Sequence, residues 1–174
     1  MKTILITGAS SGIGCALAKI YAENSHNLVL VARREEKLKD LKEELEKKHS
    51  ISVIIEVMDL SKKENLEILS LKYKNIDVLI NNAGLGQYGK FDSYNLETDI
   101  SMINLNILTP IILTKFFAKS MKSGSKIINI ASTAGFQPVP LMAIYSATKS
   151  FIVDFTLAIQ REYSNINISL FCPG

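Results

Sequence analysis

The chain has 174 residues, of which 47% are hydrophobic and 21% charged. This length predicts one domain, residues 1–174, and the composition excludes a disordered or collagen-like chain. Its 20 Lys and Arg residues stand against 17 Asp and Glu, a net charge of +3. Because the two signs are interleaved and nearly balanced, we expect no nucleic-acid partner and no binding to an anionic membrane surface.

Cysteine and histidine usage points to no metal site. Cys15 and Cys172 follow no metal-ligand or redox spacing, and His26 and His49 have no ligand cluster around them. We interpret both thiols as small buried hydrophobic groups in a reducing cytoplasm. The apolar start of the chain is too short for a signal peptide. Because polar residues interrupt the apolar segment 103–118, we also expect no membrane span.

Short apolar runs alternate with longer amphipathic ones along the chain. The short runs are rich in Ile, Val and Leu and predict strands buried on both faces. They lie at 3–7, 27–32, 51–58, 77–81, 126–131 and 167–171. Helical patterns lie at 12–23, 35–49, 62–73, 96–121 and 143–163. This alternation predicts an α/β fold: a doubly wound parallel sheet of about six strands between two helix layers, the Rossmann arrangement, which binds ligands where its strands end.

A glycine-rich turn, TGASSGIG at 7–14, follows the first predicted strand and opens a helix. Glycine lets the backbone approach a ligand closely, and a helix amino terminus offers free N–H groups to a pyrophosphate. The turn therefore predicts a dinucleotide phosphate site; the alternative is a strand–helix turn that needs glycine for packing alone. The residues expected to bind are Gly8, Ser10, Ser11, Gly12, Ile13 and Gly14.

A second glycine motif, GLGQYG at 84–89, matches the dinucleotide pattern literally. It follows the fourth predicted strand, but no helical pattern begins at Gly89. We therefore interpret it as a flexible loop rather than a phosphate turn.

Arg33 and Arg34 follow the second predicted strand, ~20 residues past the glycine turn, where dinucleotide folds contact the adenosine ribose. An arginine fork matches a 2′-phosphate, so we expect NADP(H) to be preferred. NAD(H) stays possible because Glu35 or Glu36 could reach a ribose hydroxyl. The alternative is that the arginines are solvated charges at a helix start.

Polar residues also follow the third and fourth predicted strands. Asp59, before Leu60, could accept a hydrogen bond from the adenine amino group or cap the turn ahead of Ser61. The segment NNAG at 81–84 suits a close approach of the cofactor, and Asn81 or Asn82 could also brace neighbouring strands. The cofactor residues expected here are Asp59, Leu60, Asn82, Ala83 and Gly84.

A possible catalytic group follows the fifth predicted strand. Ser132 lies just beyond it, and the four-residue spacing of Tyr145 and Lys149 places both on one helix face. A nearby ammonium favours the ionised form of a phenol and makes it usable in proton transfer. The Ser132 hydroxyl can hydrogen-bond a substrate carbonyl. A Tyr–Lys pair alone is often a chance surface pair, and only the joint arrangement indicates a site.

As a set, these motifs resemble the short-chain dehydrogenase/reductase family along the whole chain. The matching residues are TGASSGIG at 7–14, DL at 59–60, NNAG at 81–84, Asn106, Ser132, YSATK at 145–149 and Pro173-Gly174. The resemblance implies an oxidoreductase that moves a hydride between NADP(H) and a small-molecule carbonyl or alcohol substrate. The alternative is a nucleotide-binding module without catalysis.

The resemblance also implies roles for individual residues. Tyr145 is the acid/base, Lys149 binds the nicotinamide ribose and supports the ionisation of Tyr145, and Ser132 orients the carbonyl. Asn106 holds a water in a proton relay toward Lys149, although local chemistry does not separate it from Asn104. Both Tyr145 and Lys149, with Pro173 and Gly174, are also expected to contact the cofactor.

Pro110 stands four residues after Asn106, so its ring is expected to clash with the Asn106 carbonyl and distort the helix there. The freed carbonyl is where the relay water could bind.

Family members continue past the Pro-Gly pair with a substrate loop, whereas this sequence stops at Gly174. We therefore expect the carboxyl-terminal segment that closes over the nicotinamide to be missing. Strand 167–171 would then be an exposed edge. The family commonly pairs its two long helices, so a homodimer or homotetramer is possible. The aromatic residues available for that pairing, or for core packing, are Phe116, Phe117, Phe151 and Phe155.

Overall fold

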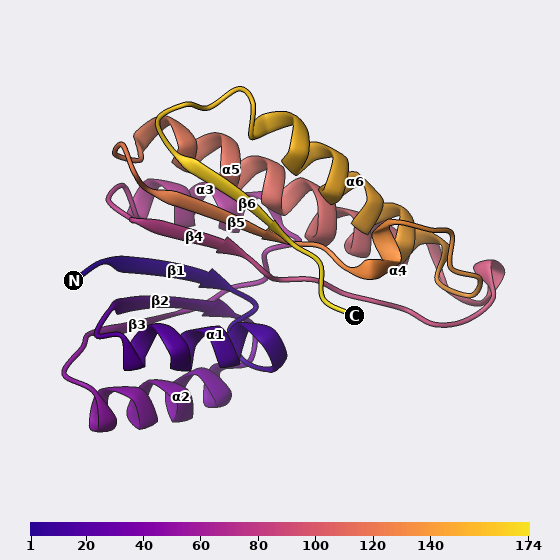
Figure 1. Ribbon diagram of the computed structural model, residues 1–174. Coiled ribbons are helices and arrows are strands. Elements are labelled where there is room, and N and C mark those ends of the chain that lie inside the picture. The colour runs from indigo at the N-terminus through magenta and orange to yellow at the C-terminus, as the bar shows by residue number, and fades with distance from the viewer.

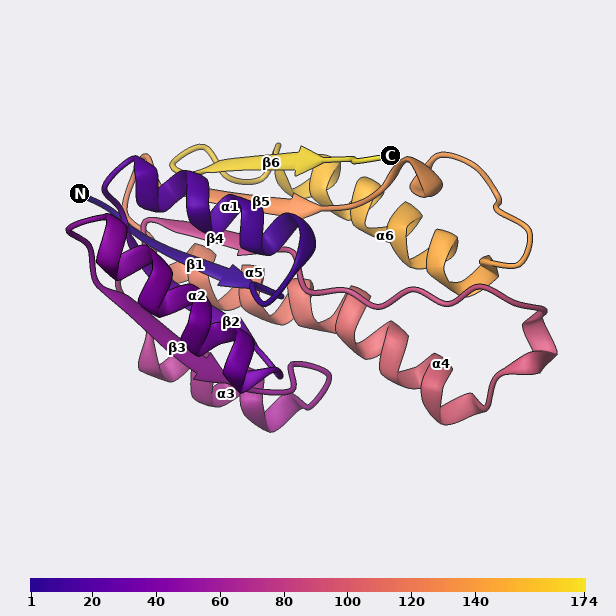
Figure 2. The same cartoon turned by 90° about the horizontal axis from the view of Figure 1, so that it is seen from below.

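The computed structural model describes residues 1–174 and contains one sheet of six parallel strands between two layers of helices (Figures 1 and 2). The strands are β1 (Thr3–Thr7), β2 (Asn27–Ala32), β3 (Val53–Val57), β4 (Val78–Asn81), β5 (Lys126–Ile130) and β6 (Asn167–Phe171). Their spatial order is β3-β2-β1-β4-β5-β6. The winding direction reverses between β1 and β4, which confirms the predicted doubly wound sheet.

The helices lie on the two faces of the sheet according to their place in the chain. They are α1 (Gly12–Glu23), α2 (Glu35–Lys48), α3 (Lys63–Lys72), α4 (Leu96–Ile103), α5 (Thr109–Ser120) and α6 (Ala143–Ile159). Figure 1 shows α1 and α2 on one face and α3, α5 and α6 on the other. Two short 3₁₀ turns, Phe91–Ser93 and Thr133–Gly135, complete the chain.

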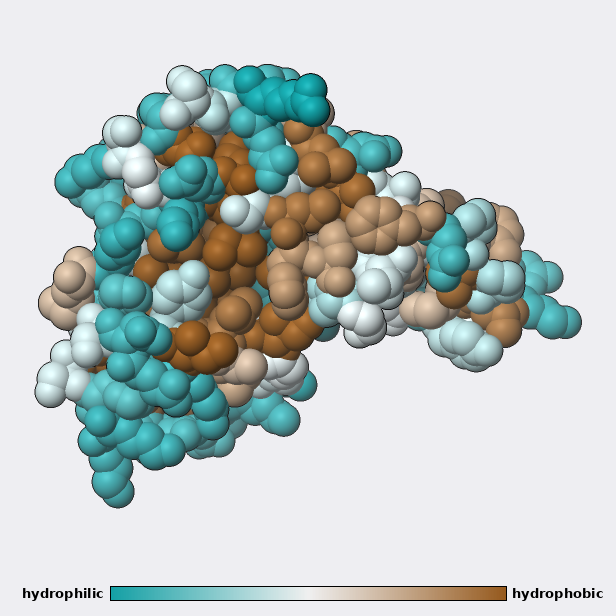
Figure 3. Space-filling model, viewed as in Figure 1, coloured by the Kyte–Doolittle hydropathy of each residue, from teal (hydrophilic) through white to brown (hydrophobic).

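Strand alternation builds a separate apolar core on each face. On β1, Leu5 belongs to a cluster with Leu113 and Phe117 of α5. Its neighbours Ile4 and Ile6 belong to the cluster on the opposite face, with α1 and α2. Each fully buried aliphatic side chain of this kind stabilises the fold by roughly 1.5–3 kcal/mol. Both layers thus hold the central strands in place. On the face shown in Figure 3, hydrophobic residues gather across the middle of the molecule, with hydrophilic residues above and below them.

The expectation that every strand is buried on both faces is wrong for the two edge strands. On β3, Ile54 and Val57 are each 45% exposed, and β6 alternates between buried and exposed residues. Each of these strands has a neighbouring strand on one side only. The last predicted helix also ends early, at Ile159 rather than at residue 163.

The long helix predicted over 96–121 is interrupted by a π-helical turn, Asn104–Leu108, which joins α4 to α5. The predicted distortion beside Asn106 is therefore present. Pro110 has no N–H to donate to the Asn106 carbonyl, and the Thr109 N–H donates five residues back, to the carbonyl of Asn104. The Thr109 hydroxyl meanwhile donates to the carbonyl of Leu60, at 2.6 Å, which ties the turn to the end of β3.

The continuous helical segment Leu96–Ser120 contains an 18-residue window with a mean hydropathy of 1.5, so it is long and apolar enough to cross a membrane. The sequence interpretation of residues 103–118 as too interrupted for a membrane span does not anticipate this. In the fold, Leu113 and Phe117 are fully buried against the sheet, and 39% of that window is buried.

Candidate active site

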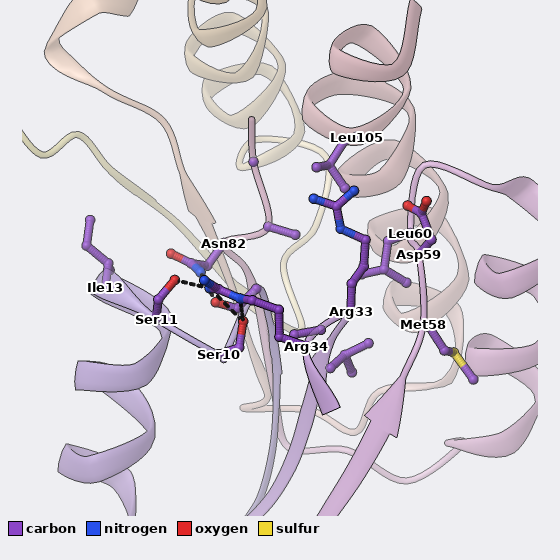
Figure 4. Close-up of a pocket in the computed structure, with 15 residues that line it drawn as sticks. Ser10, Ser11, Ile13, Arg33, Arg34, Met58, Asp59, Leu60, Asn82 and Leu105 are labelled. Carbon is purple, nitrogen blue, oxygen red and sulfur yellow. Dashed lines mark hydrogen bonds between the residues drawn. The ribbon is translucent and has the colours of Figure 1, made fainter. Parts of the chain in front are cut away.

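Two adjoining cavities form a crevice over the carboxyl ends of the strands. The first, of about 370 Å³, lies between the glycine turn and the ends of β2 and β3 (Figure 4). The second, of about 470 Å³, lies between the loop after β4, the end of β5 and the start of α6. Ile13, Asn82 and Gly84 line both cavities. The crevice therefore spans the point at which the strand order reverses, where open α/β sheets bind their ligands.

The glycine turn packs so closely that two of its positions exclude a side chain. Gly8 has a φ of 68°, and a Cβ there would lie 2.8 Å from the Cα of Ala83. A Cβ on Gly14 would lie 2.4 Å from the carbonyl oxygen of Gly8. Gly14 thus serves packing, which is the alternative considered above. Unlike Gly14, the turn residues Gly8, Ser10, Ser11 and Ile13 line the first cavity.

A single hydroxyl joins β1 to the loop after β4. The Thr7 hydroxyl donates to the carbonyl of Ile80, at 3.1 Å, and accepts from the backbone N–H groups of Asn82 and Ala83, at 2.9 and 3.0 Å. The Asn82 amide donates to the carbonyl of Thr7, at 2.9 Å. Asn82 therefore braces the strands and also lines the crevice, so both interpretations of this residue hold.

Asn81 connects β4 to β5 and α5 through a chain of hydrogen-bonded side chains that are buried and neutral. Its amide donates to Asn129 Oδ1 on β5, at 2.8 Å, and to Thr114 Oγ1 on α5, at 3.1 Å. Asn129 donates in turn to Thr156 Oγ1 on α6, at 3.0 Å. This amide chain, Thr114–Asn81–Asn129–Thr156, links α5 to α6 through two central strands.

The two arginines after β2 line the first cavity and diverge across it (Figure 4). The Arg34 guanidinium donates to the hydroxyl of Ser10, at 2.9 and 3.1 Å, and to that of Ser11. Arg33 lies on the side of Asp59. Two guanidinium groups therefore lie where the 2′-phosphate of an adenosine ribose would bind.

The neighbouring glutamates are turned away from this cavity. Glu35 pairs with Lys39 at 2.9 Å and Glu36 pairs with the same ammonium at 3.6 Å, both on α2. Neither carboxylate lines the cavity. This arrangement favours contact of the arginines with a 2′-phosphate over contact of Glu35 or Glu36 with a ribose hydroxyl.

Asp59 caps its own turn while it faces the crevice. Its Oδ1 accepts from the backbone N–H and the hydroxyl of Ser61, at 3.1 and 2.8 Å. Burial by itself raises the pKa of Asp59, but the Ser61 hydrogen bonds and the charges of Arg33 and Lys62 bring that pKa below its ordinary value. The carboxylate thus stays ionised beside Arg33.

The three side chains of the expected catalytic group line the second cavity. Ser132 begins the 3₁₀ turn after β5, and its Oγ accepts from the N–H of Ala134 at 3.1 Å, which leaves the hydroxyl proton free to donate. Lys149 is 6% exposed and its Nζ donates to the carbonyl of Ile130, at 2.9 Å. The same Nζ lies 5.7 Å from the centre of the Tyr145 ring. Phenol and ammonium therefore face one crevice.

Burial perturbs the Lys149 ammonium. Loss of hydration lowers the pKa of Lys149 from 10.5 to about 8, and negative charge on the nearby Cys172 thiol opposes that change. The amine therefore keeps its proton at neutral pH but gives it up more readily than a surface lysine.

Local chemistry does not distinguish Asn106 from Asn104, but their surroundings in the structure differ, because Asn106 is buried and Asn104 is half-buried. Asn106 is 2% exposed. Its Oδ1 accepts from the N–H of Leu85 and its Nδ2 donates to the Leu85 carbonyl, both at 2.8 Å. A Cβ on Gly84 would lie 3.4 Å from Asn106 Oδ1 and 3.6 Å from Lys149 Nζ. Asn106 thus lies beside Lys149, with the backbone of Gly84 between them.

The GLGQYG segment begins no helix at Gly89, as expected, but its first part is not a free loop. The Asn106 side chain holds both polar groups of the Leu85 backbone. Gly86 and its neighbours line the second cavity. Residues 84–86 are therefore a loop, as predicted, and Asn106 holds its backbone at Leu85.

The last residues of the described chain support the turn that carries Ser132. Ala131 N–H donates to the carbonyl of Phe171, at 2.8 Å, and Thr133 N–H to that of Pro173, at 2.9 Å. Pro173 and Gly174 both line the second cavity. Each therefore lies beside the expected catalytic group.

A family model described as short chain dehydrogenase matches residues 2–174. The chain belongs to the short-chain dehydrogenase family. Among curated relatives, it is 34% identical to the ketoacyl reductase HetN of Nostoc over 99% of this chain and 63% of that protein. It is 36% identical to an NADP-dependent 3-hydroxy acid dehydrogenase of Schizosaccharomyces pombe, over 97% and 68%.

Solved structures of short-chain dehydrogenases share this fold. The bulky-bulky ketone specific alcohol dehydrogenase of Comamonas testosteroni superposes with a TM-score of 0.96, at 33% identity over 99% of this chain and 72% of that one. A short-chain dehydrogenase of Sphingobium yanoikuyae in complex with NADPH gives 0.90, at 33% identity over 98% and 70%. The chain spans about 60% of the length of several curated relatives it matches.

In this short-chain dehydrogenase, sequence reasoning missed several residues of the crevice. Leu105 reaches the first cavity from the π-helical turn, where the direction of a side chain cannot be read from a regular helical period. Leu85, Gln87, Tyr88 and Met142 line the second cavity. The thiols also differ from expectation, because Cys15 and Cys172 are half-buried rather than buried.

Replacing Lys149 with methionine is expected to change how stability depends on pH. The pKa of Lys149 is about 8 in the fold and lies near 10.5 when the chain is unfolded. Between these values the unfolded state binds more protons, so a rise in pH stabilises the native protein through this group. The free energy of unfolding of the wild type, minus that of Lys149→Met, should therefore increase from about pH 8 to about pH 10. Urea unfolding at each pH measures the free energy of unfolding of both proteins. A difference that stays level across this range would contradict the burial of the ammonium.

Proposed function

We propose that this short-chain dehydrogenase transfers a hydride between NADP(H) and a small-molecule carbonyl or alcohol substrate. One observation carries the proposal: Lys149 is buried, anchored to the Ile130 carbonyl, and faces the Tyr145 ring in a cavity that Ser132 also lines. A surface Tyr–Lys pair would have neither the anchor nor the cavity.

The residues of the crevice fit a nicotinamide dinucleotide. Beside the glycine turn a helix amino terminus opens onto the first cavity, which suits a diphosphate. When bound, the cofactor supplies or accepts the hydride. The residues proposed to hold it are Gly8, Ser10, Ser11, Gly12, Ile13, Gly14, Arg33, Arg34, Asp59, Leu60, Asn82, Ala83, Gly84, Tyr145, Lys149, Pro173 and Gly174.

Cofactor preference is proposed from the two arginines. Guanidinium groups match a 2′-phosphate, and Glu35 and Glu36 are engaged by Lys39. The name of the Schizosaccharomyces pombe relative specifies NADP, and the Sphingobium structure holds NADPH. A similar enzyme of Burkholderia phymatum was solved with NAD, so NAD(H) remains a second, weaker ligand in this proposal.

The chain's own groups would handle the substrate oxygen. Ser132 donates its free hydroxyl proton to the carbonyl oxygen and orients it. Tyr145 gives its proton to that oxygen as negative charge develops, and Lys149 stabilises the phenolate left behind. Asn106, beside Lys149, is proposed to hold the water through which the proton is replaced. In oxidation the same steps run backward.

A nucleotide-binding module without catalysis is the second candidate, because the chain spans only part of its relatives' length. Catalysis in the whole protein is favoured by the intact arrangement of Ser132, Tyr145 and Lys149 around one cavity.

The two long helices are proposed to pair in a homodimer. Phe117 lies in the core, but Phe151 on α6 is 37% exposed and stacks on Phe155 with ring centres 5.8 Å apart. A reducing cytoplasm is proposed as the compartment, supported by two thiols that are both free.

Replacing Tyr145 with phenylalanine removes the proposed proton donor and keeps the ring. NADPH consumption with a panel of ketones should fall about 10³-fold, within the range that acid–base groups contribute together with their hydrogen bonds. NADPH affinity, followed by fluorescence, should fall far less than turnover, because the proposed contacts at the glycine turn and the arginines stay in place. Tight NADPH binding by a wild type that turns over no ketone would support the module instead.

Replacing Arg34 with alanine should weaken NADPH binding about 10- to 100-fold, because a charge-assisted hydrogen bond contributes about 1.5–3 kcal/mol. NADH has no 2′-phosphate, so its affinity should stay nearly constant. Fluorescence titration compares the two, with Lys37→Ala as a control on an exposed charge of the same helix. An equal loss for both cofactors would exclude a 2′-phosphate contact.

Replacing Phe151 with aspartate should convert the proposed dimer to a monomer, because a charge would be buried in the apolar contact. Sedimentation velocity checks this, with Ile68→Asp as the control because Ile68 is an exposed residue of α3. A wild type that sediments as a monomer would rule out the pairing.

A further inference from the structure

The loop after β4 is tied to α6 by Asn106 and by Thr148, a side chain to which the sequence motifs assigned no role. Asn106 holds the Leu85 backbone by two hydrogen bonds, and its Nδ2 also donates to Thr148 Oγ1, at 3.0 Å. The Thr148 hydroxyl donates in turn to the backbone carbonyl of Tyr145, at 2.7 Å. The loop is thus connected through two side chains to the turn of α6 that carries the Tyr145 ring.

The same loop touches that ring directly. A Cβ on Gly86 would lie 3.3 and 3.4 Å from two ring carbons of Tyr145, closer than side chains ordinarily approach. One position earlier, the loop is fixed by Asn106. The glycine therefore lets the fixed backbone lie against the phenol ring, and any side chain there would displace the ring or the loop.

We propose that Thr148 and Gly86 are positioning residues, which together set the place of the Tyr145 ring relative to Lys149. Thr148 holds the turn of α6 to Asn106, and Gly86 forms the surface against which the ring rests. Of the two glycines of GLG at 84–86, Gly86 therefore accommodates the Tyr145 ring, whereas a Cβ on Gly84 would meet Lys149 Nζ at an ordinary contact distance, 3.6 Å. The consequence for catalysis rests on the proposed function; the consequence for the ring does not.

The same helix provides a matched control for Thr148. Thr156 is also buried, donates its hydroxyl to a carbonyl of its own helix, that of Ile152, at 2.6 Å, and accepts from an asparagine amide, that of Asn129. It lies two turns further along α6 and lines neither cavity. A purely structural role would make Thr148→Val and Thr156→Val behave alike.

Gly89 is the corresponding control for Gly86. It belongs to the same loop, and a Cβ there would lie 2.8 Å from Ser93 Oγ, also a tight contact. It would not meet Tyr145. Gly86→Ala and Gly89→Ala therefore add the same methyl group to one loop, the first against the Tyr145 ring and the second against Ser93 Oγ and the Tyr94 ring, at 2.8 and 3.0 Å.

The first measurement needs no turnover. Protein labelled with ¹³C in the ring of tyrosine has six such residues, and Tyr145→Phe identifies the resonance of Tyr145. Thr148→Val and Gly86→Ala should shift that resonance, whereas Thr156→Val and Gly89→Ala should leave it in place. Thr148→Ser keeps the hydroxyl and should restore the wild-type position.

The second measurement is kinetic. Thr148→Val and Gly86→Ala should lower kcat about tenfold or more, as displacement of a reacting group does, and should displace the pH profile of kcat. KM for NADPH should change less than about twofold, because the arginine end of the crevice is untouched. Thr148→Ser should recover most of kcat.

The outcomes separate this inference from the proposed function. A wild type without turnover overturns the function, while the tyrosine resonances still test the positioning. Thr148→Val that matches the wild type in resonance, or that matches Thr156→Val in kcat, would overturn the inference. Should Thr148→Val fail to fold, Gly86→Ala against Gly89→Ala decides by the same two criteria.

Discussion

An ammonium group held almost out of water is the constraint on which the site depends. Lys149 is 6% exposed and takes part in no ion pair. Burying a charge without a counter-ion is costly unless hydrogen bonds replace its hydration. The Ile130 carbonyl supplies one such bond, at 2.9 Å. Because that carbonyl ends β5, the sheet itself determines where the charge stands.

The sheet can hold this position because its centre is rigid on both faces. The two apolar clusters sandwich β1, β2 and β4, and the polar contacts lie at the strand ends. The Thr7 hydroxyl joins the end of β1 to the loop after β4. It therefore connects the glycine turn on one side of the crevice to the loop on the other side. The glycine turn and the catalytic helix are therefore placed relative to each other by the middle strands rather than by direct contact.

Local pattern was enough to predict the strands, the glycine turn and the spacing of Tyr145 and Lys149, because each depends on neighbours in sequence. The edge exposure of β3 depends on strand order, which a single apolar run does not encode, whereas the edge position of β6 was expected from the family resemblance. The π-helical turn was foreseeable from Pro110, but the direction in which it turns Leu105 and Asn106 was not. The roles of Thr148 and Gly86 arise from contacts between residues far apart in the chain, and no short motif reveals these. Asn106 is 21 positions from Leu85 and 42 from Thr148, and Gly86 is further still from Tyr145.

The amide chain Thr114–Asn81–Asn129–Thr156 contains no group that ionises in the physiological range. The spacing between α5 and α6 that it maintains is therefore indifferent to acid and alkali, whereas the lysine a short distance along α6 gains or loses its charge near pH 8. Alkaline conditions can thus discharge that lysine without altering the charge of the hydrogen-bonded side chains that join the two helices.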